Sequence, residues 1–170
     1  MLDLNSKVFL SIHNLSGKKK ILDYFMIFGA EAIIYIAGII VAIFAFTQKG
    51  IFTQAVITIG ISIPISLILI LLLHVFIKEK RPFLRFRFIP LVTFYRNLSF
   101  PSTHTTVMTI ITLSSLIYQT SLSPFLIFCL IYLALSRIYI GVHYPVDILG
   151  GFATGVFSIA LALIFKMFFS

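Results

Sequence analysis

The sequence is poor in charge: only 11% of its 170 residues are charged, it has no tryptophan, and it has one cysteine. A soluble globular domain carries about 25% charged residues, so this shortage excludes an ordinary water-soluble domain. The lone Cys129 lies in an apolar run, which excludes a disulfide framework and a CxxC metal or redox pair. With 13 Lys and Arg against 5 Asp and Glu, the net charge is +8. Because little of the chain can form soluble surface, this balance indicates anionic lipids or anionic substrates and not nucleic acid.

Long apolar segments take the place of the missing charge, and 60% of the residues are hydrophobic. A helix needs about 20 apolar residues to cross a bilayer. We therefore predict an all-α fold, a polytopic membrane helical bundle of about five transmembrane helices. No repeat or flexible linker divides the chain, so we interpret residues 1–170 as one membrane-embedded domain. The predicted helices cover residues 24–46, 53–77, 103–118, which is short, 124–142 and 148–168.

The segments outside these helices differ in character. Residues 1–17 have apolar side chains at helical spacing, which predicts an amphipathic helix that lies in the membrane interface or caps the bundle. Residues 78–101 form a long basic loop, whereas the other connections are short. With five crossings, this loop, the Lys18–Lys20 cluster and the 136–147 stretch all lie on one face. The sequence thus predicts that loop 78–101 is part of an active site.

The stretch from Ser136 to Asp147 places an arginine, a histidine and an aspartate at the junction of the last two apolar segments. Charge in an apolar segment is costly and usually functional. Asp147 follows His143 closely enough for its carboxylate to hold one imidazole nitrogen, as expected of a nucleophile or a base. A lone intramembrane histidine is more often a hydrogen-bonded bundle residue. Arg137, His143 and Asp147 together favour a functional site.

A second polar stretch, Pro101-Ser102-Thr103-His104, begins the third apolar segment. A helix start with a hydroxyl residue offers unpaired N–H groups and a partial positive charge, which favour an anion. His104 would face the same anion and could donate a proton to a leaving oxygen. Taken alone, the tetrapeptide is more typical of an ordinary helix cap with a histidine at the interface.

A third polar stretch closes the second apolar segment at Arg81 and Pro82. An arginine can bind phosphate oxygens through two N–H groups at once, which a lysine cannot do. For the neighbouring Lys78 and Lys80, a reach from the helix end into the lipid headgroups is the better interpretation.

The first and second of these motifs resemble the signature of the type 2 phosphatidic acid phosphatase superfamily, the lipid phosphatases related to vanadium haloperoxidases. One part of that signature, SR, five residues, H, three residues, D, is matched in full from Ser136 to Asp147. Another part, PSxH, is matched from Pro101 to His104, with Thr103 where many members have glycine.

The remaining part of the signature, K, six residues, RP, is matched only at Arg81 and Pro82. His74 occupies the position of the lysine. On a continuous helix, His74 would lie two turns before Arg81 and on a similar face, and Lys78 would lie one turn before it. Either residue could replace the missing lysine, with Lys78 the better candidate, or could be a bystander that does not contact the substrate.

The resemblance implies a mechanism without metal or cofactor, through a covalent phosphohistidine. His143 would attack phosphorus, Asp147 would orient it, and His104 would protonate the leaving group. Phosphoryl transfer requires positioning and charge stabilisation above all, which arginines and a helix end can supply. The residues implied to hold the phosphate oxygens are Arg81, Ser102, Thr103 and Arg137.

Within the superfamily, the chain is similar to the bacitracin-resistance type of undecaprenyl-diphosphatase. The similarity rests on its small size, the stretch Ile12–Glu31, the missing lysine and the run PSTHTT. It implies undecaprenyl diphosphate as substrate and a role in cell wall biogenesis. Phosphatidylglycerophosphate, phosphatidic acid and diacylglycerol diphosphate are alternatives. Glu31 lies in the first apolar segment, where its carboxylate would serve the site or pair with a site arginine.

Two other classes of function stay open at this point. A metal-dependent oxidoreductase would use the histidines, but Arg81 and Arg137 would repel the cation. A non-catalytic binder or transporter of anionic lipid would need the arginines but not the pair of His143 and Asp147. We expect a multi-pass cell-membrane protein. The resemblance favours an active site on the extracytoplasmic face, whereas a simple count of basic residues favours the cytoplasm.

Overall fold

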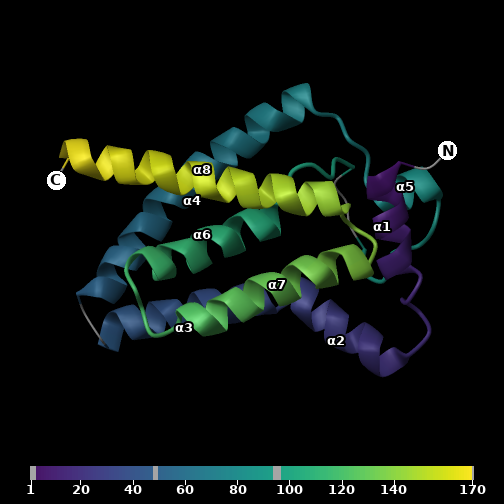
Figure 1. The fold of residues 1–170 in the computed structure, drawn as a ribbon, viewed down its shortest axis with the longest axis horizontal. Coiled ribbons are helices and arrows are strands. Elements are labelled where there is room, and N and C mark those ends of the chain that lie inside the picture. Colours follow the sequence, from purple (N-terminus) through teal and green to yellow (C-terminus); the bar gives the residue numbers. More distant parts are fainter. Residues whose placement is uncertain (1–2, 48–49, 94–96, 170) are drawn as a thin grey trace.

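The computed structural model describes residues 3–47, 50–93 and 97–169 as a bundle of α-helices (Figure 1). Met1 and Leu2 of the predicted N-terminal helix, and residues 94–96 of the predicted loop, lie outside the described residues. In chain order the helices are α1 (Leu4–His13), α2 (Lys20–Glu31), α3 (Ile33–Thr47), α4 (Ile51–Phe76), α5 (Pro82–Phe86), α6 (Thr103–Ile117), α7 (Ser123–Tyr139) and α8 (Pro145–Phe169).

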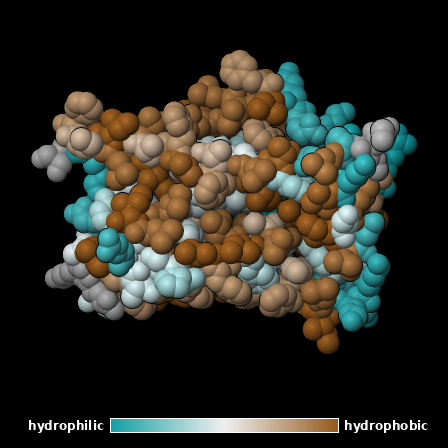
Figure 2. All heavy atoms as spheres, viewed as in Figure 1, coloured by the Kyte–Doolittle hydropathy of each residue, from teal (hydrophilic) through white to brown (hydrophobic). Residues whose placement is uncertain are grey.

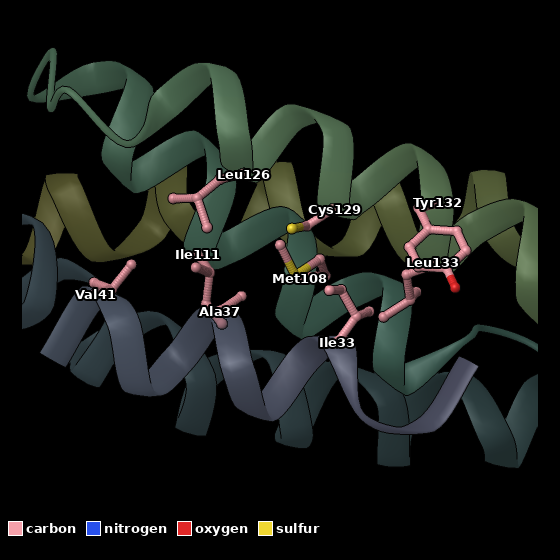
Figure 3. Packing of buried hydrophobic residues seen from close by; sticks show 9 residues of the cluster. All are labelled: Ile33, Ala37, Val41, Met108, Ile111, Leu126, Cys129, Tyr132 and Leu133. Carbon is pink, nitrogen blue, oxygen red and sulfur yellow. The ribbon is translucent and has the colours of Figure 1, made fainter. Parts of the chain in front are cut away.

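Helix α6 lies at the centre of the bundle and packs against α8, α4 and α7. On one side of it, buried apolar side chains of α3, α6 and α7 point toward one another, as Figure 3 shows. Dense packing of this kind fixes the position of α6 relative to its neighbours. The cluster consists of Ile33, Ala37, Val41, Met108, Ile111, Leu126, Cys129, Tyr132 and Leu133.

A small residue brings the start of α8 close to the start of α6. A side-chain carbon added at Gly151 would lie 2.7 Å from the carbonyl oxygen of Ser102, so only glycine allows this approach. Small residues at the contact are typical of closely packed membrane helices. The close approach sets the first turns of α6 and α8 side by side, and these turns carry two of the predicted motifs.

The surface and the lengths of the helices fit a membrane protein. Among the described residues, α4 and α8 are each long and apolar enough to cross a membrane, and α2 with α3 meets the same test as a pair bent by 49°. Helices α6 and α7 are shorter and apolar. Figure 2 shows apolar side chains along the bundle and the densest hydrophilic surface at the end that holds α1 and α5. The all-α membrane bundle is confirmed, while five crossings stay a prediction.

The first apolar segment, predicted as one helix over residues 24–46, is two helices. Helix α2 ends at Glu31 and α3 begins at Ile33. At the break, Arg137 Nη1 donates to the Ala30 carbonyl at 3.2 Å and to Glu31 Oε1 at 2.8 Å. A buried guanidinium needs such acceptors, and the end of a helix can supply a carbonyl. The prediction is wrong because it could not include a partner on α7.

The residues after α4 also differ from the prediction. Helix α4 ends at Phe76, and Lys80 then pairs in an extended conformation with Leu98. A short helix that was not predicted, α5, begins at Pro82, a position where proline is favoured. Arg81 is the N-cap of α5 and does not continue α4.

Candidate active site

The three polar motifs meet at one end of the bundle. Figure 1 shows that the end of α7 and the starts of α6 and α8 lie toward the end that holds α1 and α5. The Ser102 N–H donates to the Asp147 backbone carbonyl at 3.0 Å, which joins two of the motifs directly. Arg81 Nη1 donates to the Val142 carbonyl at 3.3 Å, which joins the remaining motif to the turn between α7 and α8.

His143 lies in the turn between α7 and α8. The turn requires Gly141, whose φ of 87° lies in the left-handed region that other residues disfavour. Asp147, in the first turn of α8, accepts the Tyr144 N–H at 2.8 Å with Oδ2. The same oxygen lies 3.4 Å from His143 Nδ1. The carboxylate therefore holds the turn and faces one imidazole nitrogen.

The other imidazole nitrogen of His143 faces Arg137. Its Nε2 lies 3.4 Å from Arg137 Nη2, and the Arg137 side chain is only 1% exposed. The acceptors at the α2–α3 break, Ala30 and Glu31, hold the Nη1 of the same guanidinium. Charge-assisted bonds of this kind are stronger than neutral ones. The break in the first apolar segment therefore keeps Arg137 beside the imidazole.

Arg81 is the second buried arginine near the turn. Its Nε donates to the Leu98 carbonyl at 3.2 Å, and its Nη1 donates to the carbonyl of Val142, the residue before His143. Carbonyl acceptors orient a guanidinium without neutralising its charge. Arg81 thus brings a positive charge to the backbone beside His143.

The start of α6 carries the second motif. Ser102 is its N-cap, and its Oγ accepts the Thr105 N–H at 3.4 Å and the Thr105 hydroxyl at 3.0 Å. Both bonds use the serine oxygen as acceptor, which leaves its hydroxyl proton to donate. Thr103 and His104 follow as the first helical residues, whose N–H groups have no acceptor within the helix. The helix cap and the anion site that the sequence suggested are therefore compatible features of one helix start.

The surroundings of His143 lower its pKa well below the ordinary value. Burial is the largest cause because it disfavours the charged imidazolium, and the positive charges of Arg137 and Arg81 act in the same direction. His143 is therefore neutral near pH 7, with a lone pair on one ring nitrogen. His104 and both arginines are therefore close enough to His143 to act on its pKa.

The two candidates for the missing lysine are not arranged as the sequence suggested. His74 lies in the last turn of α4, and Lys78 lies in the extended residues after it and is exposed. The helical spacing that related both residues to Arg81 is wrong, because α4 ends at Phe76. The exposure of Lys78 agrees with the alternative that it reaches into the headgroups.

The sequence reasoning missed the contribution of α1 to this end of the bundle. Phe9 is fully buried, stacks on Phe86 of α5 and meets Tyr144, the neighbour of His143, edge-on. Helix α1 lies within the predicted residues 1–17 and packs against this end of the bundle, and its place in the membrane interface stays a prediction. Its apolar spacing was visible in the sequence, but no local signal indicated which surface it covers.

The chemistry of the site follows from its donors and charges. Among the residues that the structure describes, no group of three His, Cys, Asp or Glu side chains is placed to hold a metal ion. The site instead combines a neutral, oriented imidazole with two guanidinium groups and a helix N-terminus. Such an arrangement can bind a phosphoryl group and attack it.

Comparison with known sequences identifies the family of the chain and two related proteins. A sequence model of the PAP2 superfamily matches residues 55–169. The undecaprenyl-diphosphatase BcrC of Bacillus subtilis (strain 168) is 34% identical over 157 residues, which cover 90% of this chain and 79% of BcrC. The putative undecaprenyl-diphosphatase YbjG of Escherichia coli (strain K12) is 34% identical over 104 residues, which cover 61% of this chain and 52% of YbjG.

Two crystal structures share the fold. LpxE of Aquifex aeolicus superposes with a TM-score of 0.72 at 24% identity, covering 95% of this chain and 96% of LpxE. A transmembrane PAP2 type phosphatidylglycerolphosphate phosphatase of Bacillus subtilis superposes with a TM-score of 0.66 at 22% identity, covering 99% of this chain and 89% of that protein. The chain therefore shares the helical fold of these two proteins.

Proposed function

The chain belongs to the PAP2 superfamily and is a membrane phosphatase of that family, and we propose that it removes the terminal phosphate of undecaprenyl diphosphate. The products are undecaprenyl phosphate and inorganic phosphate. The identity of 34% to BcrC over 90% of the chain supports this choice of substrate. An amphiphilic diphosphate also suits a site of positive charge at one end of an apolar bundle.

The placement of His143 between Asp147 and Arg137 carries the proposed mechanism. In the first step, the lone pair of His143 Nε2 forms a bond to the terminal phosphorus while the bond from phosphorus to the bridging oxygen breaks. The negative charge of the bound diphosphate favours a protonated His104, which gives its proton to that oxygen, so undecaprenyl phosphate leaves. In the second step, His104 takes a proton from water while the water oxygen attacks the phosphohistidine, which releases inorganic phosphate and the free imidazole and restores the proton on His104. Asp147 holds the imidazole through Nδ1 in both steps.

The charge that develops on the equatorial oxygens is stabilised by groups that are already in place. Arg137 and Arg81 supply two guanidinium groups, and the α6 N-terminus supplies the N–H groups of Thr103 and His104. The Ser102 hydroxyl donates to the same oxygens. In this proposal Arg81 alone binds phosphate from the motif K, six residues, RP, since the helical argument for a substitute lysine no longer holds.

Glu31 has a positioning role in this proposal. It lies 38% exposed at the α2–α3 break and binds the almost fully buried Arg137. A carboxylate at this place keeps the guanidinium oriented when no substrate is bound.

We place the active site on the extracytoplasmic face of a cell membrane. The basic residues that would indicate the cytoplasm include Arg81 and Arg137, which this proposal assigns to substrate and which therefore say little about topology. Reporter fusions at residue 90, in the long loop, and at the C-terminus would measure the location of each. Activity of the loop fusion with a reporter that works only in the cytoplasm would contradict this placement.

The substrate is tested by phosphate release in detergent with excess EDTA. The panel consists of undecaprenyl diphosphate, phosphatidylglycerophosphate, phosphatidic acid and diacylglycerol diphosphate at equal mole fraction in the micelle. We expect the highest kcat/KM on undecaprenyl diphosphate and no loss of turnover with EDTA. A higher kcat/KM on a glycerolipid, or turnover that EDTA abolishes, would contradict the proposal.

A non-catalytic binder of anionic lipid is the competing class of function. It predicts that the protein releases no phosphate from any member of the panel. It also predicts that His143→Ala and the native protein bind undecaprenyl phosphate with similar affinity and are otherwise indistinguishable. Turnover that His143→Ala abolishes separates the two classes.

A further inference from the structure

An apolar groove of about 480 Å³ opens beside the candidate active site, between α3 and α6. Both helices run from the site end toward the opposite end of the bundle (Figure 1). Its polar side chains, those of Tyr35, Thr103 and His104, belong to the first turns of these helices, and the rest of its lining is aliphatic or glycine. The groove is lined by Ile34, Tyr35, Gly38, Ile39, Thr103, His104, Val107 and Ile111.

The groove begins at a residue of the proposed mechanism. His104 lines one end of it, and Ile111 lines the other. Seven residues of α-helix separate them, which corresponds to a length of about 10 Å. A molecule with its phosphate at His143 and an apolar chain attached would continue along this path.

Gly38 opens the wall of the groove on the α3 side. A side-chain carbon added there would meet nothing within 4 Å, so the space beside it is empty of protein atoms. A glycine within a helix is usually less stable than alanine by about 1 kcal/mol, so this one is not explained by helix stability. It leaves the groove wider than a larger residue would.

A second, larger groove of about 700 Å³ lies between α3 and α4. It is lined by residues such as Ala45, Gly50 and Gln54, at the opposite end of the bundle from the three motifs. A chain lying there could not carry a phosphate to His143. Of these two grooves, the one between α3 and α6 is lined by residues of the proposed site, Thr103 and His104.

We propose that the α3–α6 groove binds the hydrocarbon chain of the substrate next to its phosphate, and that it accepts a single branched isoprenoid chain. The inference rests on the proposed function. All the lining residues of the groove belong to α3 and α6. An isoprenoid diphosphate brings one chain to its headgroup, whereas a diacylglycerol lipid brings two. The open space at Gly38 receives the methyl branches. The remainder of a long isoprenoid lies in the bilayer beyond Ile111.

Gly38→Leu tests the groove, with Gly60→Leu as the matched control. Gly60 lies within α4, and a side-chain carbon there also meets nothing within 4 Å, so both substitutions add the same group to an open helix surface. The substrates are undecaprenyl diphosphate and p-nitrophenyl phosphate, which has no hydrocarbon chain. We expect Gly38→Leu to lower kcat/KM for the lipid about tenfold or more, mainly through KM, with p-nitrophenyl phosphate turnover unchanged. Gly60→Leu should change neither.

Two results would overturn the proposal. Equal kcat/KM values of the two leucine variants on the lipid would show that the groove carries no chain. An equal loss on both substrates for Gly38→Leu would show that the change acts on the phosphate site.

A measurement of occupancy separates failure of the groove from failure of the proposed function. Gly38→Cys is labelled with N-ethylmaleimide in detergent, against Gly60→Cys, and the native Cys129 is buried and gives little background. Undecaprenyl phosphate should slow labelling at residue 38 at least several-fold, leave residue 60 unchanged, and protect better than phosphatidic acid. Protection in a protein without phosphatase activity would refute the function and keep the groove. Turnover without protection would refute the groove alone.

Discussion

The two ends of the bundle each hold a cation among apolar helices, but with different partners. At the site end, Arg137 is bound by a carbonyl and a carboxylate and also faces the imidazole of His143. At the far end, Lys166 of α8 donates to Gln54 Oε1 at 2.9 Å, to Thr58 Oγ1 at 3.2 Å and to Tyr118 Oη at 2.8 Å. These three neutral acceptors use all three donors of the ammonium group.

The difference separates a structural cluster from a binding site. Lys166 completes its own hydrogen bonds and ties α8 to α4 and the end of α6. Arg137, by contrast, also faces His143, with 3.4 Å between Nη2 and Nε2, and Nε2 is the nitrogen that the proposed mechanism uses to attack phosphorus. Substitutions at the site end should therefore lower turnover with little effect on stability. A substitution at Lys166 should lower stability and leave turnover unchanged.

The largest expected effect is that of His143→Ala at the site end. Without the nucleophile no phosphoenzyme can form, so kcat should fall about 10⁴-fold or more. Phosphate release in micelles measures it, with the melting temperature as a control for folding. A residual rate within tenfold of the native enzyme would contradict the assignment of the nucleophile.

Asp147→Asn should be the next most damaging change. The amide can still accept the Tyr144 N–H and so preserve the turn, but it cannot stabilise the imidazole as a carboxylate does. We expect kcat to fall about 10²–10⁴-fold with little change in thermal stability. A loss of stability that matches the loss of activity would instead assign Asp147 a purely structural role.

The pH dependence of kcat/KM sharpens the comparison further. His143 must be neutral to attack, and its pKa is lowered, so it stays neutral as the pH falls through about 6.5, the ordinary histidine value. On the acid side of the profile, activity should then fall about tenfold per pH unit only below the lowered pKa of His143. The pKa of the substrate phosphate is measured by ³¹P NMR, and its contribution is subtracted from the pH profile of kcat/KM. An acid limb of His143 centred above about 6.5 would refute the neutral, buried nucleophile.

Glu31→Ala should have a smaller effect at the same end. Arg137 loses a charge-assisted hydrogen bond of about 1.5 kcal/mol, which corresponds to about a tenfold loss of kcat/KM, carried mainly by KM. Glu31→Gln keeps an acceptor oxygen and should recover most of the loss. If the glutamine variant is as impaired as the alanine variant, the hydrogen bond is not what positions Arg137.

Lys166→Met should have the smallest effect on turnover and a clear effect on stability. The variant leaves the polar groups of Gln54, Thr58 and Tyr118 without their shared donor, at a cost of about 1–2 kcal/mol. We expect a lower melting temperature and an unchanged kcat per folded molecule. A loss of turnover above about tenfold would erase the distinction between the two ends.

Local signals were sufficient to predict much of the fold. The predictions for α4 and α6 lie close to the observed bounds, because a long apolar run and a proline with a hydroxyl residue are features of a few adjacent residues. The break between α2 and α3 could not be predicted this way. Its partner, Arg137, is 106 residues away from Glu31 in the chain. The placement of α1 could not be predicted from local signals either, since the surface that Phe9 covers is assembled from distant segments.

In the candidate site, too, only relations between residues close in the sequence could be predicted. The spacing of His143 and Asp147 within one turn of chain was sufficient to predict their proximity, which the distance of 3.4 Å bears out. The argument for Lys78 extended a helix beyond Phe76, where the chain forms an isolated bridge to Leu98 instead. A helix end that is decided by pairing with a later segment leaves little trace in the local sequence.

The most direct test of the account is to trap the covalent intermediate. The native protein and His143→Ala are mixed with undecaprenyl diphosphate labelled with ³²P in the terminal phosphate and quenched within milliseconds into alkali. The account predicts an alkali-stable, acid-labile phosphoprotein in the native sample, with the phosphate on His143 by mass spectrometry, and none in the variant. Rapid turnover with no phosphoprotein, or with the phosphate on another residue, would contradict it.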